Sequence, residues 1–134
     1  MTLTRDLTDL LIVKMAQSLS QGISIVDARQ RADIELPCLA IAVTASEPHS
    51  VAFPQVQRCT IEMTMRCHAG DADTDAPNTW GGQIEEVIQN PETMKAISNA
   101  EITIVHWAYG SSTDNWDESS YEVTFEASCL IQAI

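Results

Sequence analysis

The sequence predicts a single α+β domain, spanning residues 1–134, in which an N-terminal helix and a central helical segment pack on a mainly antiparallel four-stranded sheet. Three observations support this fold class. Apolar residues recur at helical spacing near the N-terminus. Two later stretches alternate apolar and polar residues, as half-buried strands do. The length of 134 residues is that of one domain.

The first expected element is an amphipathic helix over residues 4–19. Thr4 is placed to serve as its N-cap, and Gly22 stands where a helix-ending glycine would. Residues 23–26 are a candidate short strand that is not counted among the four. The apolar face of the helix consists of Leu7, Leu10, Leu11, Met15 and Leu19.

Two strands are expected next, joined by a loop. Residues 36–44 are nearly continuously apolar, and Pro37 is compatible with a strand only near its start or on an edge. Residues 45–54 contain two prolines and are expected to form a loop. Residues 56–68 alternate and predict a long half-buried strand. The buried face of that strand is expected to hold Cys59, Ile61, Met63, Met65 and Cys67.

A helical segment follows the polar connection at residues 69–79. Thr79 or Asn78 is a plausible N-cap, and a second short helix is expected from Pro91, with Asn90 as its cap. The first of these helices has an apolar face made of Trp80, Ile84, Val87 and Ile88.

The last two strands are expected at residues 101–109 and 121–131. Residues 110–120 between them are polar and are interpreted as a loop containing one aromatic residue, Trp116. Trp116 is interpreted either as a lid over the protein's own core or, because tryptophan is enriched at the centres of protein interfaces, as a contact residue for a partner. Phe53, between the prolines of the earlier loop, is a second candidate.

The segment from Cys59 to Asp75 resembles a metal site at first sight. On a strand, however, the Cα atoms of Cys59 and Cys67 would lie roughly 26 Å apart, too far for one metal ion or one disulfide. His68 would point to the opposite face. We therefore interpret the thiols as reduced core residues, with a metal site that uses one of them and a remote partner as the alternative.

Asp71, Asp73 and Asp75 have the spacing of the first three ligands of an EF-hand loop. That loop also needs glycine at its sixth position and glutamate at its twelfth, and these positions hold Ala76 and Gly82. The segment is therefore interpreted as a solvated acidic turn. The three aspartates remain candidate interaction residues.

No motif in the sequence indicates catalysis. There is neither a nucleophile elbow nor a glycine-rich phosphate-binding loop, so no enzyme activity, cofactor or bound metal is expected. The N-terminus does not read as a signal peptide, and no apolar run reaches the roughly 20 residues of a membrane span. We expect synthesis in the cytosol and no membrane partner.

The charge is strongly negative and unevenly distributed. The formal net charge is −12, and residues 32–134 carry sixteen acidic but only three basic side chains. Such a surface repels phosphates, which argues against nucleic-acid binding.

Three short motifs stand out in the element order: "ELPCLAIAVT" at 35–44, "EPHS" at 47–50 and "RCHAGD" at 66–71. Together with the order of helices and strands, they resemble the tail terminator (tail completion) proteins of long-tailed bacteriophages. The likeness covers roughly residues 33–132 and the leading helix.

The resemblance implies a structural role without catalytic residues. Such proteins form a ring, typically a hexamer, that caps the tail tube and provides the docking surface for the head connector. The implied partners are further copies of the chain, the tail tube protein, a head connector or neck protein and, as a further candidate, the sheath protein. The implied location is the virion tail or neck, assembled in the cytoplasm of the host bacterium.

DNA would pass through the ring without specific binding, and acids from the outward face of the strands or from residues 69–79 are candidates to line the bore. Three other functions are considered. One is a different neck or tail-tube protein. Another is a small cytosolic metal-binding or enzymatic domain that uses Cys and His residues. The third is a generic acidic adaptor domain.

Overall fold

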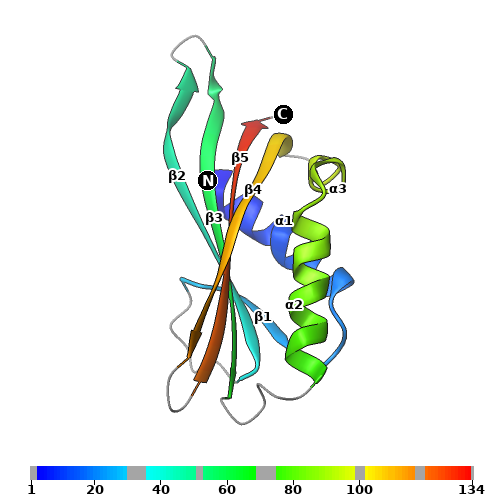
Figure 1. The fold of residues 1–134 in the computed structure, drawn as a ribbon. Coiled ribbons are helices and arrows are strands. Elements are labelled where there is room, and N and C mark those ends of the chain that lie inside the picture. The colour runs from blue at the N-terminus through cyan, green and yellow to red at the C-terminus, as the bar shows by residue number, and fades with distance from the viewer. Residues whose placement is uncertain are drawn as a thin grey trace.

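The computed structural model describes residues 3–29, 36–50, 53–68, 75–98, 102–116 and 120–133 (Figure 1). Three helices and five strands occur in these residues. Their order is α1 (Leu3–Ser18), β1 (Ser24–Asp27), β2 (Cys38–Ser50), β3 (Phe53–His68), α2 (Asp75–Ile88), α3 (Pro91–Lys95), β4 (Ile102–Trp116) and β5 (Ser120–Ala133).

The sheet has five strands in the order β1-β2-β3-β5-β4, so the predicted four-stranded, mainly antiparallel sheet is wrong. The added strand is β1, which runs parallel to β2 and pairs Ser24 with Cys38 and Asp27 with Ile41. The other neighbouring pairs are antiparallel. A four-residue strand has too few positions for a periodic signal, and its partner is chosen by contacts across the fold.

Both predicted loops are instead the ends of long hairpins. Strand β2 continues through residues 45–50 and pairs with β3, while β4 continues through residues 110–116 and pairs with β5. Pro48 lies at a shift in register, where a missing N–H is tolerated. The cross-strand hydrogen bonds to the long neighbouring strands β3 and β5 outweigh the low strand propensity of these polar segments.

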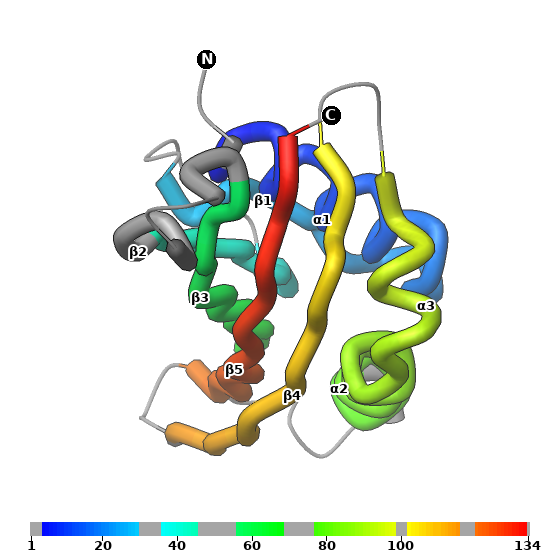
Figure 2. Tube along the Cα trace, turned by 90° about the horizontal axis from the view of Figure 1, so that it is seen from above, coloured from blue at the N-terminus to red at the C-terminus, as the bar shows by residue number. Residues whose placement is uncertain are grey.

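The helices lie on one side of the sheet, as expected (Figure 2). The alternating prediction for β3 is confirmed: its odd-numbered residues from 59 to 67 are buried and lie in the same core as the helices. Leu7, Leu11 and Met15 of α1 and Ile84 and Ile88 of α2 complete this core. The opposite side of the sheet is uncovered by the described helices.

Two tryptophans anchor α2. The Nε1 of Trp80 donates to the carbonyl oxygen of Ser20 at 3.1 Å, and the Nε1 of Trp107 donates to the carbonyl oxygen of Ile88 at 2.7 Å. Gly22 has a φ of +107°, and a Cβ there would lie 3.4 Å from the Trp80 ring. The turn after α1 therefore favours glycine for its backbone conformation, since L side chains rarely adopt this φ.

The expected helix ends are partly corrected. Helix α1 begins at Leu3 and ends at Ser18, so Thr4 lies within its first turn and Gly22 lies beyond the helix-ending position. Helix α2 begins at Asp75, ahead of the expected cap. Asn90 is confirmed as the cap of α3, because its side chain accepts from the backbone N–H groups of the first turn.

We expect Leu11→Ala to lower the free energy of unfolding by about 2–5 kcal/mol, because it removes a fully buried side chain from the contact between α1 and the sheet. Val13→Ala, on the same helix, is the matched control because Val13 is 55% exposed. Urea denaturation of both variants measures the difference. Equal losses for the two would contradict the described packing of α1.

Candidate functional site

The side of the sheet opposite the helices, which we call the open face, is a candidate contact surface. It is formed by the even-numbered residues of β3 from 58 to 66, those of β5 from 122 to 130, and their partners in β2 and β4. Most of these side chains are small or polar, including a threonine pair, Thr64 and Thr124, whose hydroxyls lie 3.3 Å apart. This composition suits a solvated or protein-covered surface.

The charges of the open face are mixed. Arg66 forms an ion pair with Glu122, its direct cross-strand partner. Glu62 lies directly opposite Glu126, and both are exposed. Like charges in this position repel each other. Two of the three basic residues in 32–134, Arg58 and Arg66, lie on this face. The open face is therefore not the uniformly acidic lining that the net charge alone suggests.

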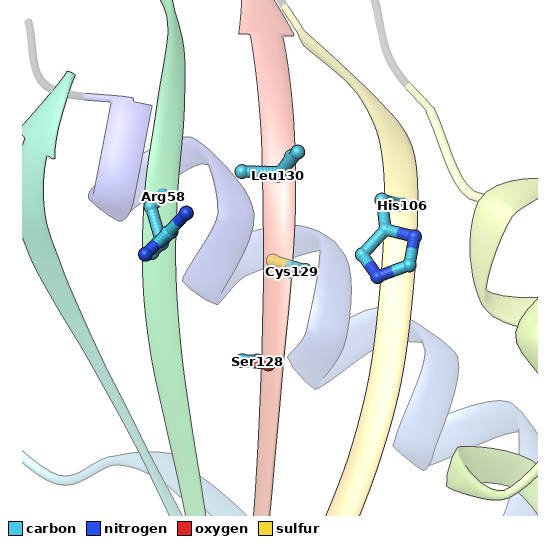
Figure 3. Close-up of a pocket in the computed structure, with 5 residues that line it drawn as sticks. All are labelled: Arg58, His106, Ser128, Cys129 and Leu130. Atoms are coloured by element: carbon cyan, nitrogen blue, oxygen red, sulfur yellow. The ribbon is translucent and has the colours of Figure 1, made fainter. Parts of the chain in front are cut away.

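A hollow of about 560 Å³ occupies one end of the open face (Figure 3). Arg58, Leu130 and His106 form one row across β3, β5 and β4, with the two nitrogen-bearing side chains on either side of the leucine. Ser128 and Cys129 also line it. A guanidinium and an imidazole around an apolar centre suit contact with a peptide surface that carries a carboxylate.

The ligands for a metal ion do not gather in the described part of the chain. No group of three or more His, Cys, Asp or Glu residues there could hold one. His68 is exposed on the face opposite Cys67, as expected. Asp71 and Asp73 lie outside the described residues. Asp75 begins α2, and its side chain also lies outside what the structure describes.

All four cysteines are free thiols and buried, which confirms the core assignment of Cys59 and Cys67. The register also places Cys59 directly opposite Cys129, a pair that the spacing within one strand could not reveal. A hydrogen bond between the two thiols lowers the pKa of Cys59, against the effect of burial. The same hydrogen bond, together with burial, raises the pKa of Cys129. The two thiols therefore interact with each other across β3 and β5.

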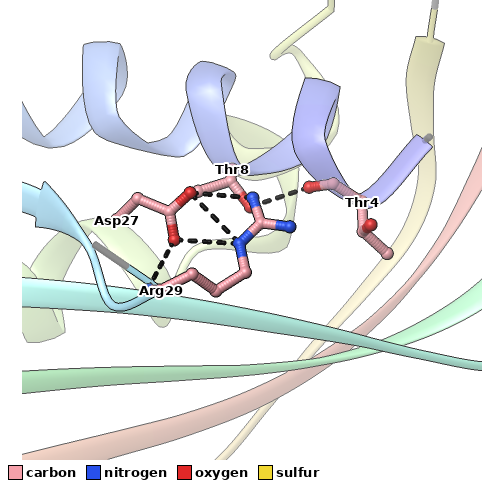
Figure 4. Close-up of polar contacts among 4 residues, drawn as sticks. All are labelled: Thr4, Thr8, Asp27 and Arg29. Atoms are coloured by element: carbon pink, nitrogen blue, oxygen red, sulfur yellow. Dashed lines mark hydrogen bonds and ion pairs between the residues drawn. The ribbon is translucent and has the colours of Figure 1, made fainter. Parts of the chain in front are cut away.

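The Asp27–Arg29 pair closes the end of β1 (Figure 4). The guanidinium of Arg29 contacts both carboxylate oxygens of Asp27, at 2.7 Å for the shortest contact, and the backbone N–H of Arg29 donates to the same carboxylate at 2.9 Å. These bonds lower the pKa of Asp27. Beside them, the hydroxyl of Thr8 donates to the carbonyl oxygen of Thr4 within α1. The pair therefore stabilises the turn at the end of β1 and connects only residues of this one segment.

The two aromatic candidates lie at opposite ends of the sheet. Phe53 is the first residue of β3 and pairs with Ser50 at one hairpin, whereas Trp116 is the last residue of β4 and pairs with Tyr121 at the other. Their side chains lie outside what the structure describes. The two candidates thus belong to different hairpins.

Comparison with protein families and with curated proteins finds no match to this chain. Within the described residues, no helix is long and apolar enough to cross a lipid bilayer.

We expect Glu62→Gln and Glu126→Gln each to raise the free energy of unfolding by about 0.2–1 kcal/mol, because either change removes the repulsion across β3 and β5. The double variant should gain less than the sum of the two, since one repulsion can be removed only once. Urea denaturation at low and high salt measures this, and the gain should shrink with salt. Strictly additive gains would show that the two carboxylates do not interact.

Proposed function

We propose that the chain is a virion structural protein, a tail terminator that forms a ring on the end of the tail tube and joins it to the head connector or neck. The single observation that carries this proposal is the arrangement of two long hairpins, β2–β3 and β4–β5, which turn at opposite ends of one sheet (Figure 1). The resemblance in motifs and element order supports the same role.

The hairpins provide two contact surfaces that are far apart. Phe53 begins β3, and the last residue of β3, His68, pairs with Ser120 at the opposite hairpin. The two turns are therefore separated by the length of β3, which is roughly 50 Å for its 16 residues. A subunit placed between a tube and a connector needs such a pair of surfaces, one for each neighbour.

The acidic composition supports a channel through which DNA passes without binding. The net charge of −12 disfavours phosphate contacts with the protein as a whole. Because the open face carries mixed charges, the acids of residues 69–79 and of the helices are the stronger candidates for that lining. The remaining partners in the proposal are further copies of the chain in the ring and, where a sheath is present, the sheath protein.

We expect Phe53→Ala and Trp116→Ala to leave the fold intact and to impair different steps of assembly. Removing an aromatic anchor at an interface typically costs about 2 kcal/mol or more, roughly 30-fold in affinity. One variant should produce tails of irregular length, and the other should produce normal tails without heads. Electron microscopy of lysates from phage carrying each substitution measures both outcomes.

Val13→Ala is the control, because it shortens an exposed apolar side chain on α1 and changes no residue of either hairpin. Normal tail length and head attachment in both aromatic variants would remove these residues from the interface. An identical defect in both would contradict the assignment of the two hairpins to different neighbours.

The same hairpin geometry fits another ring-forming neck or tail-tube protein. Deletion of the gene separates these functions. Loss of a terminator leaves tubes that assemble with uncontrolled length, loss of a neck protein leaves finished tails without heads, and loss of a tube protein leaves no tubes.

A further inference from the structure

The pair of thiols at the centre of the sheet is the feature that the proposed function does not use. Among the four cysteines, the register sets only Cys59 and Cys129 opposite each other. Cys67 lies opposite Tyr121, and Cys38 lies opposite Arg66. The pair belongs to β3 and β5, the two strands from which the hairpins extend.

The backbone geometry of this pair is compatible with a covalent bond. Directly opposed residues of antiparallel strands have Cα atoms about 4.5–5.5 Å apart, within the range of about 4.4–6.8 Å found for disulfides. Both side chains point to the buried face, with exposed fractions of 0% for Cys59 and 2% for Cys129. Because both residues are directly paired and point to the same face, the two thiols are neighbours across β3 and β5.

The geometry points to Cys59 and Cys129 as a reversible modification site, at which a peroxide oxidises the two thiols to a disulfide between β3 and β5. This inference rests on the register of the sheet and is independent of the proposed function. A small oxidant is required because the site is buried. Cys129 is also part of the lining of the hollow on the open face, which brings solvent close to this position of β5 (Figure 3).

The reaction consumes one peroxide and both thiol hydrogens. The thiolate of Cys59 attacks one peroxide oxygen and breaks the O–O bond, which leaves a sulfenic acid on Cys59 and releases water after protonation. The sulfur of Cys129 then attacks the sulfenic sulfur, forms the S–S bond and expels a second water, which takes up the thiol proton. Each sulfur is oxidised by one electron, and the two peroxide oxygens are reduced.

The bond would join the adjacent strands β3 and β5. It would therefore fix the position of one hairpin relative to the other. It would also close a loop of about 70 residues in the unfolded chain, which stabilises the folded state. The Cβ atoms of directly opposed residues lie somewhat farther apart than those of an average disulfide. The bond therefore remains open to reduction by small thiols.

Trypsin cleavage tests this inference, because it places each of the four cysteines in a different peptide. Cleavage after Arg58, Arg66 and Lys95 places Cys59 in peptide 59–66, Cys67 in 67–95 and Cys129 in 96–134, while Cys38 lies in 32–58. Reduced, folded protein is treated with hydrogen peroxide, unfolded in an alkylating agent, digested and analysed by mass spectrometry. We expect peptides 59–66 and 96–134 to be joined, with Cys38 and Cys67 alkylated.

Two further measurements accompany the map. The oxidised protein should melt about 5–15 °C higher than the reduced protein, and dithiothreitol should reverse the shift. The double variant Cys38→Ala/Cys67→Ala is the matched control and should keep both the cross-link and the shift, whereas Cys129→Ala should lose them. Because the wild-type map is decisive on its own, a variant that fails to fold does not weaken the test.

Three outcomes would overturn the inference. One is four alkylated cysteines in protein that was exposed to peroxide while folded. Another is a cross-link that joins a peptide other than 59–66 to 96–134. The third is the expected cross-link forming only when the protein is unfolded before oxidation.

Discussion

The antiparallel pairing of β3 with β5 is the constraint on which the rest of the structure depends. It places Met63 opposite Phe125 in the core and Arg66 opposite Glu122 on the open face. Because side chains alternate along a strand, a slip of one residue would move every core side chain of β3 into solvent and every polar one into the core. The burial of the odd-numbered residues from 59 to 67 therefore makes this register strongly preferred.

The same pairing explains why one sheet carries two different surfaces. Its covered face contacts α1 and α2 through apolar side chains, and the tryptophan hydrogen bonds to Ser20 and Ile88 fix where α2 lies. Its open face holds threonines, charges of both signs and the hollow around Leu130. A protein built this way has its chemical groups spread over a surface, which suits contact with large partners better than the confinement of a small substrate.

The hairpins extend this two-sided sheet at both ends. Since β3 and β5 run in opposite directions and each is joined to its outer neighbour by a turn, the two turns must lie at opposite ends. In the proposed function, this separation lets one subunit contact two neighbours along an axis. The thiol pair lies on the two strands that connect these ends. A disulfide at this pair would therefore make the relative position of the two hairpins more rigid.

Local patterns in the sequence determined the presence of the helices, the burial of the alternating residues in β3 and the Asn90 cap. They also showed that Cys59 and Cys67 are too far apart on one strand to share a metal ion. Each of these features depends on neighbours that are close in the sequence. Tertiary structure alone decided the parallel pairing of β1, the conversion of residues 45–50 and 110–116 from expected loops into strands, and the meeting of Cys59 with Cys129. In each of these cases the deciding hydrogen bonds or contacts join segments that are distant in the chain. Their register is set by how whole strands align, and no short stretch of sequence carries that information.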